Sequence, residues 1–124
     1  MKTNANYRQK PALLLFCWLL LPFFPTLAQT PVSNQAADSL YQQGLFAEAA
    51  SIYQQLSARW QAASAPDSAR YYQLQQARCY VKQQEFAVAG PLLDSLLQQP
   101  GTSRNPGFLS KVYHEKAFTL MGQG

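Results

Sequence analysis

The 124-residue chain has few of the residues that build catalytic and metal sites: two cysteines, one histidine and six acidic residues. The acids are scattered along the chain, which argues against paired-carboxylate chemistry. No serine has a histidine–aspartate pair to activate it, and no glycine-rich phosphate loop is present. His114 has no cysteine, aspartate or second histidine at ligand spacing. We therefore expect a protein that is not an enzyme and that binds no metal or cofactor.

Cysteine is too scarce for an internal disulfide. Cys17 lies in an N-terminal segment that we expect to be removed, which leaves Cys79 alone. A single cysteine in an exported protein can pair with another chain. Because Cys79 lies in the packed stretch 77–80, we interpret it instead as a small buried side chain.

Long hydrophobic runs are missing apart from a short one over residues 12–21, which follows three basic residues and precedes two prolines. This run is shorter than the ~20 residues of a membrane-spanning helix, so an uncleaved anchor is disfavoured. The pattern predicts a secretory signal peptide over residues 1–28, cleaved between Ala28 and Gln29. We expect a periplasmic or extracellular protein of a bacterial envelope, with membrane contact only through export or a missing C-terminal part.

Most of the net positive charge lies in the predicted signal peptide. The whole chain has a formal net charge of +4, with ten basic residues. Removing the three that precede residue 11 leaves seven basic residues against six acids, so residues 29–124 are close to neutral. The charge balance therefore gives no reason to expect a nucleic-acid partner.

The sequence does contain an internal repeat with a period of 40 residues. The matching positions are Ala37, Ala77 and Ala117; Phe46 and Phe86; Ala49 and Ala89; and Leu56 and Leu96. A fixed period of this length marks an array whose units bury their apolar faces against one another. We expect the alanines to lie where helices approach closely, and the third copy to be incomplete at Gly124.

Apolar residues recur at helical spacing within each copy. We predict five helices, over residues 33–43, 46–61, 67–83, 86–98 and 106–121. Gly44 suits the end of the first helix, and Asp67 and Asn105 are candidate N-caps of the third and fifth. We expect the Pro-Gly pair at 100–101 to end the fourth helix, and Pro91 to kink it or delay its start.

The first copy has a distinctive order of residues. Ala37 lies mid-helix, Gly44 is at the turn, Phe46 follows two residues later, and a Glu-Ala pair then precedes Tyr53. This order resembles a tetratricopeptide repeat. The second copy resembles a degenerate version, because Gln84 replaces the turn glycine.

The resemblance implies an all-α solenoid of antiparallel helix pairs with about two and a half repeats, near 30–69, 70–109 and 110–124. In this family the first helices of successive repeats line a concave groove that holds an extended peptide or a partner helix. Transferred position by position, the groove residues are Asn34, Asp38, Tyr41, Gln42, Tyr71, Leu74, Arg78, Val81, Lys82, Lys111, His114, Phe118 and Met121.

We therefore interpret the chain as an exported module that binds a protein or peptide. A groove that clamps a C-terminal carboxylate is disfavoured, because Asp38 and Glu115 stand where that variant has an amide and a cation. Two other functions stay open. The chain could be the N-terminal sensor or scaffold part of a larger signalling receptor or peptidase, with its catalytic domain beyond residue 124. It could also be a glycan-binding outer-membrane protein, although that class usually has a lipid-attachment cysteine and a longer chain.

Overall fold

The computed structural model describes residues 31–124, which form six helices and no strand. The helices are α2 (Asn34–Gln42), α3 (Phe46–Ala62), α4 (Pro66–Lys82), α5 (Phe86–Gln98), α6 (Pro100–Ser103) and α7 (Pro106–Gln123). The prediction of an all-α fold is confirmed. The predicted signal peptide, with Cys17 and the cleavage site at Ala28 and Gln29, lies outside the described residues. None of the described helices is long and apolar enough to cross a membrane.

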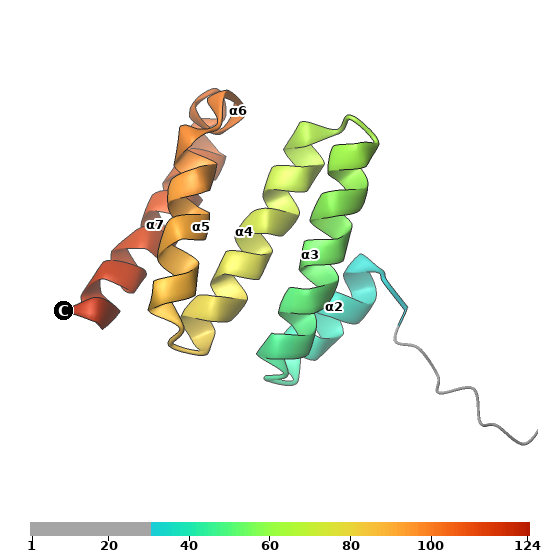
Figure 1. Ribbon diagram of the computed structural model, residues 1–124, viewed down its shortest axis with the longest axis horizontal. Coiled ribbons are helices and arrows are strands. Elements are labelled where there is room, and N and C mark those ends of the chain that lie inside the picture. The colour runs from blue at the N-terminus through green and yellow to red at the C-terminus, as the bar shows by residue number, and fades with distance from the viewer. Residues whose placement is uncertain (1–30) are drawn as a thin grey trace, which may run out of the picture. The chain divides into compact units, whose positions relative to one another are not determined.

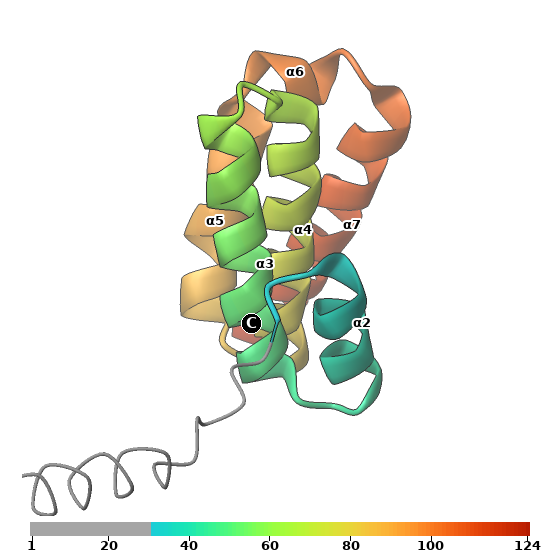
Figure 2. The ribbon, with the colours of Figure 1, turned by 90° about the vertical axis from the view of Figure 1, so that its right-hand side faces the viewer.

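Successive long helices reverse direction, and α4 has the central place among them (Figure 1). It packs against α3 on one side and against α5 and α7 on the other. Figure 2 shows α3 and α5 on one side of the molecule and α2 and α7 on the opposite side, with α4 between them. One face of α4 is therefore left to border α7.

Three turns share one backbone geometry and lie at residues 44, 64 and 84, which are 20 residues apart. Gly44, Ser64 and Gln84 all have the left-handed conformation, with φ values of 79°, 58° and 60°. In each turn the following N–H donates to the carbonyl five residues earlier, at 2.9 Å: Leu45 to Leu40, Ala65 to Trp60, and Glu85 to Tyr80. This is the hydrogen bond that closes a helix at a left-handed residue. The prediction that Gly44 ends the first helix is confirmed.

Two buried clusters meet at α4. The first joins α2, α3 and α4 through Ala37, Ala49, Ala50, Ile52, Tyr53, Leu56 and Cys79. The second joins α4, α5 and α7 through Leu74, Ala77, Leu93, Leu96 and Val112. Four of the repeat alanines, at 37, 49, 77 and 89, are fully buried, as expected for close helix contacts. The expectation for Ala117 was wrong: it is exposed, because no described helix covers that side of α7.

The connection after α5 differs from the prediction. Pro100 and Gly101 do not simply end a helix but open the one-turn helix α6. The buried Thr102 hydroxyl donates to the Leu96 carbonyl at 2.6 Å, so α6 closes the C-terminal end of α5. α5 itself begins at Phe86, five residues before Pro91, so its start is not delayed.

The two predicted N-caps had different outcomes. Asn105 caps α7 as predicted, since its side-chain oxygen accepts from the Phe108 N–H at 3.1 Å. Asp67 is not a cap, because α4 starts one residue earlier, at Pro66. Proline suits the first position of a helix, where its missing N–H costs nothing. Asp67 lies in the first turn instead and forms an ion pair with Arg70.

Candidate binding groove

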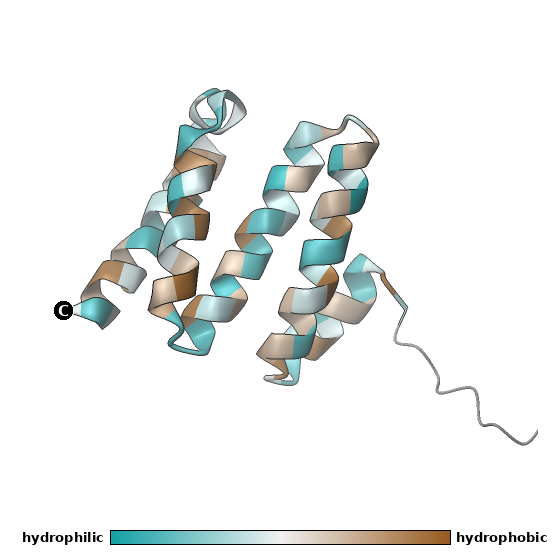
Figure 3. Cartoon of the chain, viewed as in Figure 1, coloured by the Kyte–Doolittle hydropathy of each residue, from teal (hydrophilic) through white to brown (hydrophobic). Residues whose placement is uncertain are grey.

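α4 is central in the fold, yet its sequence is more polar than that of α5, the most apolar helix (Figure 3). The reason is that α4 has two kinds of surface. Ala77 and Cys79 belong to the two buried clusters. Residues 71, 75, 78 and 82 recur at a spacing of three or four, so they lie along one helical face, which borders α7.

Two hollows adjoin along this face. The first has a volume of about 340 Å³ and is lined by Tyr71, Leu74, Gln75, Arg78, Phe108, Ser110, Lys111, His114 and Glu115. The second has a volume of about 600 Å³ and is lined by Arg78, Val81, Lys82, Gln84, Phe86, His114, Glu115, Phe118, Met121 and Gly122. They share Arg78, His114 and Glu115, so the two hollows adjoin, and together we call them the α4/α7 groove.

Nine of the sequence-predicted residues line the α4/α7 groove: Tyr71, Leu74, Arg78, Val81, Lys82, Lys111, His114, Phe118 and Met121. These are all the positions transferred to the second and third copies. Leu74 is 2% exposed and belongs to the second buried cluster, so it forms part of the floor.

Arg78 links three helices at the middle of the groove. Its Nε atom lies 3.1 Å from Glu115 Oε1 on α7, and its Nη1 donates to Gln75 Oε1 at 3.1 Å. The guanidinium carbon lies 5.8 Å from the centre of the Tyr41 ring on α2, within cation–π range. These contacts hold Arg78 in place and largely neutralise its charge. Within residues 31–124, Lys82 and Lys111 form no ion pair, so they supply the groove's uncompensated positive charge.

Apolar and aromatic side chains are exposed along the same groove. The rings of His114 and Phe118 meet edge to face at 4.9 Å. Phe118 is 47% exposed, Met121 69% and Tyr71 42%. Aromatic rings bury large areas on binding, and methionine adapts to differently shaped partners. The surface therefore combines apolar anchor points with two lysines.

The four predicted residues on α2 are not among the lining residues. The Tyr53 hydroxyl donates to Asp38 Oδ1 at 2.5 Å, and burial together with this hydrogen bond raises the pKa of Tyr53. Asp38 thus has a structural role. Asn34 is half-buried, and its side-chain oxygen has no hydrogen-bond partner among the described residues. Gln42 is exposed outside the groove. Tyr41 does not line the groove, but its ring contacts Arg78, which does.

The sequence prediction missed several lining residues, of which Phe108 and Glu115 matter most. Phe108 forms one end of the groove, and Glu115 holds Arg78. Helical spacing could have found both, because 108, 111, 115 and 118 lie on one face of a helix.

Cys79 and the metal-ligating residues add no further site. Cys79 is fully buried, and burial raises its pKa to about 12, as expected for a structural side chain. No group of three or more histidine, cysteine, aspartate or glutamate side chains gathers in the part of the chain that the structure describes.

Comparisons with family models, curated proteins and solved structures found no match to this chain. The interpretation of the α4/α7 groove therefore rests on its own residues.

Proposed function

We propose that this protein is an exported helical module that binds an extended peptide or a partner helix in the α4/α7 groove. The observation that carries the proposal is the combination of exposed Phe118, Met121 and Tyr71 with Lys82 and Lys111 in two adjoining hollows. Neither lysine forms an ion pair within residues 31–124. Binding surfaces are typically built from aromatic and apolar anchors that become buried, with charged groups at the rim.

The partner's chemistry follows from these side chains. An apolar residue on the partner would pack against Phe118 and Met121. Acidic residues to either side would pair with Lys82 and Lys111, which line the two different hollows. We therefore propose a partner segment with an apolar residue between acidic ones.

We also propose that the helices form tetratricopeptide-like pairs stacked as a solenoid, with a 40-residue unit. The equal turns at 44, 64 and 84 support this, since two successive helix–turn segments make up one period of the sequence. So does the burial of Ala37 and Ala77, and of Ala49 and Ala89, at matching positions.

Export is the remaining part of the proposal and rests on the N-terminal sequence. The intact mass of the protein from the envelope fraction should correspond to a chain that starts at or near Gln29. A retained Met1 in the membrane fraction would contradict cleavage. A mass larger than that of residues 1–124 would favour the larger-receptor alternative.

Photo-crosslinking in the producing cells tests the groove directly. A photoreactive phenylalanine analogue is placed at His114, which lies in both hollows, and in a control at Gln55, an exposed residue of α3. We expect a discrete crosslinked product from position 114 and none of the same size from position 55. Equal products from both positions, or none from 114, would contradict the proposed binding site.

A further inference from the structure

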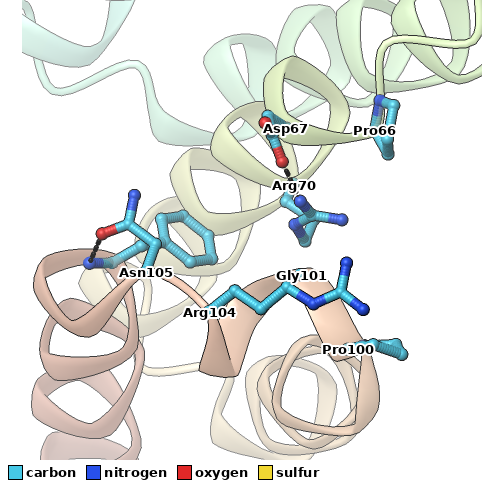
Figure 4. Close-up of a pocket in the computed structure, with 8 residues that line it drawn as sticks. Pro66, Asp67, Arg70, Pro100, Gly101, Arg104 and Asn105 are labelled. Carbon is cyan, nitrogen blue, oxygen red and sulfur yellow. Dashed lines mark hydrogen bonds and ion pairs between the residues drawn. The ribbon is translucent and has the colours of Figure 1, made fainter.

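A second depression lies beyond Phe108, where the first turn of α4 faces α6 (Figure 4). Its volume is about 650 Å³. Figure 4 shows Arg70 from α4 and Arg104, which follows α6, extending into the same space. Pro66 and Pro100 stand on opposite sides of this space, and Phe108 lines it as well. The depression thus combines two guanidinium groups with apolar walls.

Arg70 is unusual because it is a buried cation, with 9% of the residue exposed. Its guanidinium lies against Gly101, where a Cβ atom would overlap it. The hydrogen bond that the structure gives it is from Nη2 to Asp67, although a guanidinium has five N–H donors. The other side-chain nitrogens of Arg70 have no hydrogen-bond partner among the described residues, and they are not fully buried. Its remaining donors are therefore open to the depression.

Arg104 supplies the second positive charge. It is exposed and forms no ion pair within residues 31–124. Asp67 compensates one of the two guanidinium groups, so the depression has one net positive charge. A single carboxylate would neutralise this charge, whereas a phosphate group carries about −1.5 to −2 at neutral pH and would leave an excess of negative charge.

We propose that this depression, the Arg70/Arg104 site, binds a carboxylate with an apolar stem. The carboxylate oxygens accept hydrogen bonds from the two guanidinium groups, which match its geometry. The stem packs against Pro66, Pro100 and the Phe108 ring. This site adjoins the α4/α7 groove and shares Phe108 with it, but none of the groove's lysines takes part.

Titration of the full chain with benzoate, followed by amide NMR, tests this assignment. Benzamide is the matched neutral ligand, and phenyl phosphate presents a phosphate on the same ring. We expect benzoate to shift the amide signals of Arg70, Gly101 and Arg104, and to bind more tightly than either of the other ligands. Binding of benzamide equal to that of benzoate, or tighter binding of phenyl phosphate, would overturn the assignment to a carboxylate.

The benzoate affinities of two arginine variants test whether the ligand binds at the Arg70/Arg104 site. Arg104→Gln should weaken benzoate binding at least about fivefold, because it removes charge-assisted hydrogen bonds. Arg59→Gln removes the same charge from an exposed position on α3 and should leave the affinity unchanged. Arg104 is exposed, so its replacement should leave the fold intact, which thermal melting checks. Equal affinity of the two variants would show that the Arg70/Arg104 site does not hold the ligand.

Discussion

Fully buried alanines set how closely neighbouring helices approach in this molecule. Ala49 is 0% exposed and lies on α3 within the first buried cluster. Ala49→Leu should overpack this contact and lower the free energy of unfolding by about 1–3 kcal/mol. Ala58→Leu is the matched control, because Ala58 is exposed on the same helix. Urea denaturation measures both, and equal stabilities of the two variants would contradict the packing described for Ala49.

The buried thiol of Cys79 gives a pH dependence with a defined sign. Burial raises its pKa from an ordinary 9.0 to about 12. The folded protein therefore holds this proton more tightly than the unfolded chain does. The stabilising contribution is complete below pH 9 and is lost as the pH rises toward 12.

Denaturation across this alkaline window compares the wild-type protein with Cys79→Ala. We expect the stability of the wild type to fall more steeply with pH than that of the variant. Burial also raises the pKa values of Tyr41, Tyr53 and Tyr72, which both proteins retain. Cys79 adds a smaller contribution for Tyr41 and Tyr53, so the effect of Tyr72 cancels and the loss of that contribution forms part of the expected difference. Parallel pH profiles would contradict the burial of the thiol.

The site residues show which single-residue properties a sequence can predict. Positions on α4 and α7 came from the resemblance to a tetratricopeptide repeat, and they line the groove because it uses the regular helical face there. The role of Asp38 could not be predicted in this way. Its carboxylate accepts from Tyr53, which lies 15 residues later on another helix, and no local pattern encodes such a contact.

Among the structural elements, the three left-handed turns give the clearest prediction. Ser64 and Gln84 occupy a conformation that Gly44 adopts without strain. The left-handed conformation costs a residue with a side chain about 1–2 kcal/mol of strain, which glycine avoids. Glycine in turn lowers stability by about 0.4–1 kcal/mol, because it increases the conformational entropy of the unfolded chain. Ser64→Gly and Gln84→Gly should each stabilise the protein by about 0.5–1 kcal/mol.

Gln83→Gly is the control for this pair, because Gln83 precedes the left-handed residue and has a φ of −82°. There glycine should destabilise the protein by about 0.5–1 kcal/mol. Thermal or urea unfolding measures the difference. Destabilisation by Ser64→Gly and Gln84→Gly as well would show that these turns are not strained.

Helix positions were largely predictable from the sequence, whereas the connection between α5 and α7 was not. Five helices fall within one or two residues of their predicted bounds, since apolar periodicity and turn residues define them. The helix α6 was missed because Pro100 and Gly101 also form a common end signal. The hydrogen bond from Thr102 to Leu96, which helps to hold α6 in place, depends on the folded end of α5.

At the scale of the whole molecule, the fold leaves one polar face of a central helix open beside α7. Arg78 joins that face to α7 through Glu115 and to α2 through Tyr41. The structural core and the α4/α7 groove therefore share α4. Apart from Leu74, which belongs to both, the side chains of its groove face lie outside the buried clusters, so their substitution should change binding with little effect on these clusters.

The affinity of a peptide selected on this protein from a random library tests the central claim most directly. Phe118 is 47% exposed in the groove, and its replacement by alanine removes a main apolar anchor. We predict that Phe118→Ala weakens the peptide at least about tenfold, while Gln55→Ala on α3 leaves the affinity unchanged and both variants stay folded. Unchanged affinity of Phe118→Ala, or an equal loss in Gln55→Ala, would contradict the proposal that the α4/α7 groove is the binding surface.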